Sequence, residues 1–233
     1  MKTIELLQKL RAMPVFTVND LSRILGKSDK YVKVVAYRLC KQGLVKRIER
    51  GKYTVYDDAV EIASYITTPS YISFWTALRI YGLTEQLPSD AMVAVTKPKK
   101  EIDFGGTKIA FAKTRHFWAY GKMRYREFDI FIADKEKSVI DSMLSKNTPF
   151  EEAAKAILSG KLNYEKLVEY VRKTKNQSLA KRVGYLMEKN KVDANGLLGM
   201  VGTLYTRLDT SRKVKGKRDF RWKIIVNSDV DKI

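Results

Sequence analysis

Residues 17–56 contain two helix-like segments joined by a tight turn and followed by two strand-like runs, and no other stretch limits the fold as strongly. Thr17 is a good N-cap for the first segment. Asp20 follows in the first turn, where an acid favours the positive end of a helix. Gly26 suits the turn because glycine adopts a positive φ without steric cost. We therefore expect a short helix, a turn and a longer helix in this stretch.

The longer segment predicts a helix with two different faces. Ser28 is a suitable N-cap, and Gly43 is a natural residue just past the helix end. Apolar residues at the i, i+3, i+4 and i+7 spacing of a core-facing stripe are Val32, Val35, Ala36 and Leu39. The opposite face carries Lys30, Lys33, Val34, Tyr37 and, one turn further, Lys41. The alternating runs LVKRI and KYTVY around Gly51 then predict a β-hairpin. The whole pattern is that of a winged helix-turn-helix.

This architecture favours a role in DNA binding. Its second helix enters the major groove, where side chains near the helix N-terminus reach base edges and flanking phosphates. Basic residues of the wing, Lys46 among them, suit phosphates or a minor groove. The residues expected to contact DNA are Lys27, Ser28, Lys30, Tyr31, Lys33, Tyr37, Lys41, Arg47, Arg50 and Lys52. The alternative interpretation is that these are ordinary solvent-exposed side chains.

The rest of the chain mixes helical and strand-like patterns. Helices are expected at 4–12, 57–66, 71–88, 134–144, 150–158, 164–173 and 178–189. Strands are expected at 92–97, 124–133 and 221–227, with a hairpin over 101–114 that turns at Gly105–Gly106. We predict an α+β fold, with a winged helix-turn-helix domain over residues 1–57 and a mixed α/β domain over 58–233. A subdivision near residue 146 stays open, because the sequence is mostly helical from Asn147 onward.

The chain is strongly basic. Its 45 Lys and Arg residues exceed its 26 Asp and Glu residues, which gives a formal net charge of +19. A nucleic-acid partner accounts for this balance best, a solvated surface is the simpler alternative, and a membrane surface is the lesser one. No run of about 18 apolar residues predicts a transmembrane helix. The amphipathic start MKTIELLQKLRAM carries Glu5 and does not suit a secretory signal.

Residues suited to catalysis or metal binding are scarce. Cys40 and His116 are the single cysteine and histidine, whereas a typical zinc site takes about four Cys or His ligands. One cysteine suits a reducing cytoplasm, and Cys40 is expected to pack inside the longer helix. Asp103, Glu127 and Asp129 would be needed for a metal nuclease, but no lysine stands two residues after any of them. We expect no enzyme activity, metal or cofactor; a nucleic-acid enzyme of unfamiliar type is the remaining alternative.

A second concentration of charge lies near the C-terminal end of the sequence. It consists of Arg212, Lys213, Lys215, Lys217, Arg218 and Arg221, followed by Lys223. Phe220 and Trp222 interleave with these residues, which would suit stacking on single-stranded bases. Contact with RNA or with a partner's substrate is one interpretation, and non-specific clamping of DNA is another. The simpler alternative is a solvated loop that leads into a final strand, with Trp222 packed on the core.

Three blocks occur in an order similar to that of a known family. They are SYISFWTALRIYGLTEQLP, FIADKEKSVIDSML and LDTSRKVKGKRDFRWKIIVN, of which the first is the most specific. With the winged helix-turn-helix in front of them, they resemble the AbiE-type antitoxins, the transcriptional regulators of abortive-infection toxin–antitoxin systems. The resemblance covers almost the whole chain and includes no catalytic signature.

The resemblance implies a function. Such antitoxins bind inverted repeats of double-stranded DNA at their own promoter and repress it, and their C-terminal domain counters a nucleotidyltransferase-like toxin encoded beside them. Whether the antitoxin contacts the toxin directly is left open. The alternative is a winged-helix regulator whose C-terminal domain senses a ligand or mediates assembly and that has no toxin partner.

Overall fold

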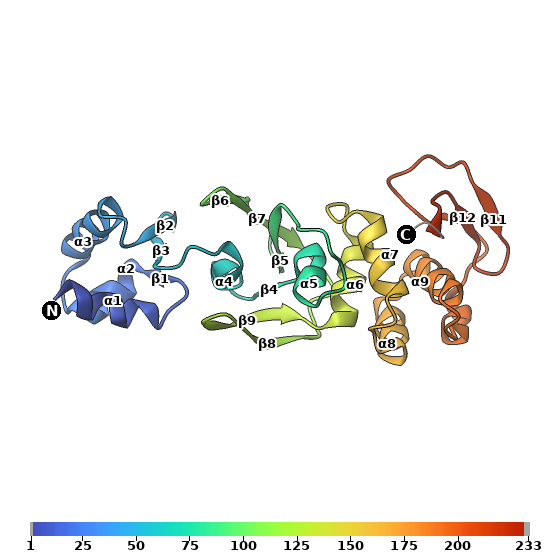
Figure 1. Cartoon of the computed structure of the whole chain (residues 1–233), viewed down its shortest axis with the longest axis horizontal. Coiled ribbons are helices and arrows are strands. Elements are labelled where there is room, and N and C mark those ends of the chain that lie inside the picture. The colour runs from blue at the N-terminus through green and yellow to red at the C-terminus, as the bar shows by residue number, and fades with distance from the viewer. Residues whose placement is uncertain (1, 231–233) are drawn as a thin grey trace. The chain divides into compact units, whose positions relative to one another are not determined.

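The computed structural model describes residues 2–230, which divide into two compact units (Figure 1). The first unit comprises the residues up to Ile72 together with Ser89–Phe117 and Gly121–Ile132. The second comprises Ser73–Pro88, Trp118–Tyr120 and the residues from Ala133 onward. Among the described residues, no helix combines the length and the apolar character that crossing a bilayer requires.

The N-terminal part of the first unit is a winged helix-turn-helix, as the sequence predicts. Its elements are α1 (Thr3–Arg11), β1 (Phe16–Thr17), α2 (Val18–Leu25), α3 (Asp29–Lys41), β2 (Lys46–Glu49) and β3 (Lys52–Thr54). The strands form an antiparallel sheet in the order β1-β3-β2. Pairing of β1 with β3 was not expected from the sequence. It joins the segment before α2 to the wing, so the hairpin is held against the helices.

Local signals explain where α2 and α3 begin and end. The Asp20 N–H donates to Thr17 Oγ1 at 3.3 Å, and the Thr17 N–H donates to Asp20 Oδ2 at 2.8 Å, which completes a capping box. Gly26 ends α2 with φ at 62°, and Gly43 follows α3 with φ at 72°. Ser28 occupies the N-cap position of α3, but its side chain makes no capping hydrogen bond. The expected caps and turns are thus confirmed in position.

The helices of this motif enclose a small apolar core. Leu21 of α2 packs with the buried residues of α3, which are Val32, Ala36 and Leu39. Val35 and Cys40 are partly buried against the same core. Burial raises the pKa of the Cys40 thiol, which is consistent with the packing role expected for it. One face of α3 is therefore fully used in folding, and its other face remains at the surface.

The remainder of the first unit is built on a six-stranded sheet in the order β6-β7-β5-β4-β9-β8. Its strands are β4 (Ser70–Ile72), β5 (Asp90–Val95), β6 (Ile102–Phe104), β7 (Thr107–Lys113), β8 (Tyr120–Tyr125) and β9 (Phe128–Ala133). The β4–β9 and β5–β7 pairs are parallel, whereas β4–β5 and β6–β7 are antiparallel. The expected buried strand near 92–97 and the hairpin at Gly105–Gly106 are confirmed.

Three expectations about this region are corrected. Residues 124–133 are not one strand but most of the β8–β9 hairpin, which turns at Arg126 with φ at 49°. The helix expected over 71–88 spans only α5 (Phe74–Ile80), because Tyr71 and Ile72 are fully buried in the central strand β4. The helix expected over 57–66 is reduced to α4 (Ala59–Ala63). Apolar runs this short fit a strand as well as a helix.

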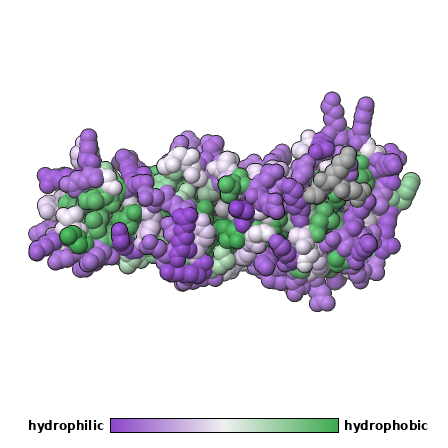
Figure 2. Space-filling view, viewed as in Figure 1, coloured by the Kyte–Doolittle hydropathy of each residue, from purple (hydrophilic) through white to green (hydrophobic). Residues whose placement is uncertain are grey.

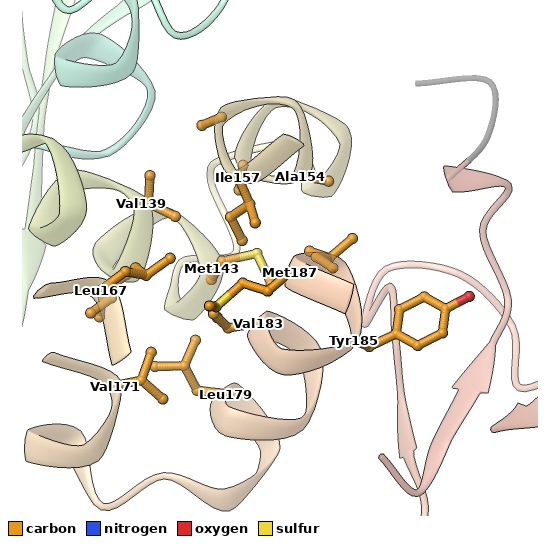
Figure 3. Close-up of a cluster of buried hydrophobic side chains, with 14 of the residues drawn as sticks. Val139, Met143, Ala154, Ile157, Leu167, Val171, Leu179, Val183, Tyr185 and Met187 are labelled. Carbon is orange, nitrogen blue, oxygen red and sulfur yellow. The ribbon is translucent and has the colours of Figure 1, made fainter. Parts of the chain in front are cut away.

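The second unit has a helical core. It contains α5 with α6 (Lys135–Leu144), α7 (Phe150–Leu158), α8 (Tyr164–Thr174), α9 (Gln177–Lys189) and the 3-10 turn η1 (Asn195–Met200). Figure 3 shows Val139, Ile157, Leu167 and Val183 from four of these helices pointing toward one another. The sequence predicted α6 to α9 correctly. Burial of an apolar core of this kind stabilises the second unit.

Three short strands follow the helices in the second unit. They are β10 (Thr206–Arg207), β11 (Lys217–Asp219) and β12 (Ile224–Val226), in the order β10-β12-β11. Trp222, in the turn between β11 and β12, is fully buried against α9. A Cβ atom at Gly184 would lie 2.1 Å from the Trp222 ring, so α9 accepts the indole because position 184 has no side chain. The hairpin is thereby fixed to the helical core.

Candidate nucleic-acid interface

The outer face of α3 presents positive charge and apolar surface together. Lys30, Lys33 and Lys41 are exposed, and within the described part of the chain none of them pairs with an acid. Tyr37 is 61% exposed, and Lys41 Nζ lies 5.7 Å from the centre of its ring. Contiguous exposed apolar surface rimmed by polar residues is typical of interaction sites. The outer face of α3 thus combines exposed lysines with the exposed ring of Tyr37.

The N-terminal end of α3 adds polar groups to this face. Lys27 and Ser28 lie in the exposed turn before the helix, and Tyr31 in the first turn is 53% exposed. The unused hydroxyl of Ser28 remains available to an external partner. Backbone N–H groups at a helix N-terminus favour an anion such as a phosphate. A phosphate group could therefore be accepted at the N-terminal end of α3.

The wing has fewer available cations than its sequence suggests. Arg47 and Arg50 are exposed, and Arg47 Nε donates a hydrogen bond of 3.4 Å to the Glu49 carbonyl. Lys52 is half-buried; its Nζ lies 3.0 Å from a Glu49 carboxylate oxygen and also donates to the Ile66 carbonyl. Lys46 pairs with Asp57. The two arginines are thus the wing side chains best placed to meet a phosphate.

Two residues of the outer face were not among the expected contacts. Val34 is 49% exposed, and Arg38 is exposed one helical turn after it. The i, i+4 spacing of these positions places them on one side of the helix, beside Tyr37. This helical spacing could have identified both residues as candidate contacts from the sequence. A valine in this position offers a methyl-sized apolar contact of the kind that recognises thymine in the major groove.

The acids considered for a metal site are dispersed. Asp103 is on β6 and Asp129 on β9, and three strands of the sheet lie between β6 and β9. Within residues 2–230, no three Asp, Glu, His or Cys side chains are grouped so that they could hold a metal ion. His116 is half-buried, and its carbonyl accepts a hydrogen bond of 3.4 Å from the Tyr71 hydroxyl. Its backbone has a structural role.

The second basic concentration, which we call the C-terminal basic surface, comprises Arg212, Lys213, Lys215, Lys217, Arg218 and Arg221, and all six residues are exposed. Stacking of Trp222 on bases is ruled out, because its ring is buried and its Nε1 donates to Glu188 at 2.6 Å. Phe220, in contrast, is 73% exposed. The alternation at this turn sends one aromatic ring inward and the other outward.

Comparison with known proteins supports the interpretation of the winged helix. Residues 5–56 match the family model described as "Transcriptional regulator, AbiEi antitoxin". The resemblance to the AbiEi antitoxins is confirmed over these residues. The description is that of a regulator and not of an enzyme, and DNA binding is implied by it. No curated protein matched the chain.

Proposed function

We propose that this chain represses its own promoter by binding inverted repeats of double-stranded DNA, and that it counters a nucleotidyltransferase-like toxin in the cytoplasm. The observation that carries the DNA-binding part is the outer face of α3, where exposed lysines with no acidic partner among residues 2–230 lie around exposed apolar side chains. The family match over residues 5–56 supports the regulatory part. The toxin partner rests on the family resemblance of the later blocks.

The proposal places α3 in the major groove and the wing against the backbone. Lys33 and Arg50 then lie over phosphates from two separate elements, while Val34 and Tyr37 face the bases. Lys27, Ser28, Lys30, Tyr31, Lys41 and Arg47 complete the proposed contacts, and Lys52 contributes less because Glu49 already neutralises it. Phosphate contacts set affinity and position, and base contacts set sequence preference.

Salt titrations of promoter binding test this placement. Lys33→Ala and Arg50→Ala should each weaken binding to the chain's own promoter fragment and lower the salt slope by about one unit, because each removes one phosphate contact. Lys113→Ala on β7 is a matched control: it removes an exposed lysine outside the winged helix and should change neither quantity. Unchanged affinity and slope in both test variants would refute the placement.

Antitoxin activity is tested separately from repression. Full-length protein is expressed from an unrelated promoter together with the product of the neighbouring gene, and growth is measured. A variant with Lys30→Ala, Lys33→Ala and Arg50→Ala should lose promoter binding and still restore growth if neutralisation belongs to the second unit. Loss of both activities would contradict that division, and the absence of any toxic neighbour would contradict the antitoxin function.

A cavity in the second unit favours the ligand-sensing alternative. It has a volume of about 600 Å³ and is lined by residues that include Arg182, Ser142 and Thr148. In the described part of the chain, the hydroxyls of Ser142 and Thr148 are buried without a hydrogen-bond partner. A sensor must couple its ligand to promoter affinity. If no compound in a panel of nucleotides and phosphorylated sugars changes promoter binding, this alternative loses its support.

A further inference from the structure

Positive charge is left without a counter-charge on the C-terminal basic surface. Its outermost arginines are neutralised: Arg212 lies 2.7 Å from Glu151 Oε1, and Arg221 lies 2.7 Å from Glu188 Oε1. Within the described residues no acid pairs with the four cations between them, which are Lys213, Lys215, Lys217 and Arg218. The ends of this segment are thus neutralised, whereas its middle keeps positive charge that could meet a polyanion.

These cations border a cavity. It has a volume of about 680 Å³, and Lys215, Lys217 and Arg218 lie along it with Tyr185 and Lys189 of α9. Figure 3 shows the buried Tyr185 side chain directed from α9 toward the C-terminal strands. The lining also contains Asp219 and Asp229, so four cationic side chains face two acidic ones. Asp219 Oδ1 is occupied by the Trp222 N–H at 2.7 Å. Among the described residues that line the cavity, positive charge is therefore in surplus.

An exposed phenylalanine, Phe220, and a half-buried tyrosine, Tyr205, lie beside this charge. Phe220 meets Tyr205 edge to face, with 6.5 Å between the ring centroids. The Arg218 guanidinium carbon lies 5.2 Å from the centre of the Tyr205 ring. Hydrophilic side chains otherwise dominate the visible face over the C-terminal strands (Figure 2). An aromatic pair flanked by cations offers both a stacking platform for bases and charges for the backbone that joins them.

The surface is held in shape by the fold. Lys217 pairs with Val226 and Arg218 with Ile225 in the β11–β12 ladder. At Gly216 a Cβ atom would lie 2.1 Å from the Val226 carbonyl oxygen. Only glycine therefore allows the backbone to come this close to β12. The buried Trp222 anchors the turn that carries Phe220. A surface fixed before binding avoids much of the entropy cost of ordering a loop.

We propose that the C-terminal basic surface binds single-stranded nucleic acid, independently of the winged helix. Lys213, Lys215, Lys217 and Arg218 hold the phosphates, and Phe220 stacks on a base. A single strand fits better than a duplex because a duplex encloses its base faces in the helical stack and leaves only base edges accessible. This proposal does not rest on promoter binding.

Fluorescence anisotropy on the full chain tests it, with labelled oligo(dT) and oligo(U) of about 20 nucleotides, longer than the site of a single-strand-binding domain. The protein carries Lys30→Ala, Lys33→Ala and Arg50→Ala so that the winged helix contributes little. In this background Phe220→Ala should weaken binding about tenfold, as loss of one base-stacking contact does. Lys217→Ala should lower the salt slope by about 0.7, the value for one phosphate of a single strand.

Two controls separate this surface from general basicity. Phe220→Trp keeps an aromatic ring and should retain binding, and Lys135→Ala removes an exposed lysine of α6 and should leave binding unchanged. Equal melting temperatures show that the variants fold. The proposal is overturned if the oligonucleotides do not bind, if Lys135→Ala weakens binding as much as Lys217→Ala, or if only a protein partner is lost with Phe220→Ala.

Discussion

The outer face of α3 and the C-terminal basic surface use similar residues in different geometries. Both place lysines beside exposed aromatic side chains. On α3 the side chains repeat along a helix of 13 residues and form one continuous stripe. On the C-terminal surface they come from a short strand, a turn and a loop beside a cavity. A straight helix matches the major groove of a duplex, whereas a hairpin edge with a cavity suits a strand whose bases are unstacked.

The two regions also differ in which charges are neutralised. In the wing, Glu49 lies within 3.0 Å of Lys52 and 2.7 Å of Lys99, so a lysine of the expected contact set is already paired. On the C-terminal surface the flanking arginines are paired, whereas the central lysines have no acidic partner among the described residues. Counting basic residues therefore predicts neither surface correctly. What matters is which side chains keep their charge uncompensated after folding.

Charge reversal on α3 should give the largest difference between promoter binding and oligo(dT) binding. Lys30→Glu combined with Lys33→Glu removes two contacts and introduces repulsion with the phosphates. Promoter affinity should fall on the order of 100-fold or more, measured by anisotropy at low salt. Binding of oligo(dT) should change less than twofold by the same measurement. A parallel loss on both ligands would mean that the two regions form one interface.

Gly184→Ala should instead affect the C-terminal basic surface. The new methyl group meets the Trp222 ring, and overpacking of this kind costs about 1–3 kcal/mol of unfolding free energy. The hairpin turn that carries Phe220 should shift, and oligo(dT) binding should weaken while promoter binding persists. Denaturant unfolding and both binding titrations check this. Gly199→Ala, where no atom lies within 4 Å of the added Cβ, is the control.

The smallest effect concerns base recognition. If Val34 contacts a thymine methyl group, replacing thymine by uracil in the promoter should weaken binding about fivefold, near the lower limit for one base contact. Val34→Ala should weaken binding to the thymine promoter and remove the difference between the two DNAs. Oligo(dT) and oligo(dU) should bind the C-terminal surface within about twofold of each other, because stacking tolerates either base. A thymine preference there would contradict the division of roles.

The sequence predicted the winged helix well because its signals are local. Thr17 and Asp20 cap each other three residues apart, and Gly26 marks the turn without help from the rest of the fold. The β8–β9 turn was missed because Arg126, a non-glycine residue, adopts a positive φ there. The adjacent residues, Tyr125 and Glu127, are not typical turn residues either. Such a conformation is held by the surrounding sheet rather than by residue preference.

The sites show the same division between local and distant causes. The exposure of Lys33 and Tyr37 followed from helical spacing alone. The pairing of Lys52 depends on Glu49 and on the Ile66 carbonyl, which the hairpin and α4 bring together. The direction of Trp222 depends on a glycine in another helix, Gly184. Sequence patterns along one element therefore identified candidate residues, and contacts between elements decided which of them stay available.

The hydrogen bond from Trp222 to Glu188 gives the second unit an NMR probe, because the chemical shift of the Trp222 indole N–H can report binding nearby without a label attached to the surface. A charge-assisted bond of 2.6 Å should move the Trp222 indole proton well downfield. Trp75 Nε1, in contrast, is buried without a hydrogen-bond partner among the described residues. Among the three tryptophans of the chain, the Trp222 and Trp75 indole protons should therefore give separate peaks in a ¹⁵N-correlated spectrum, and the Trp222 peak reports from the turn that carries Phe220. An oligonucleotide that stacks on Phe220 would shift one peak and leave the other as an internal standard.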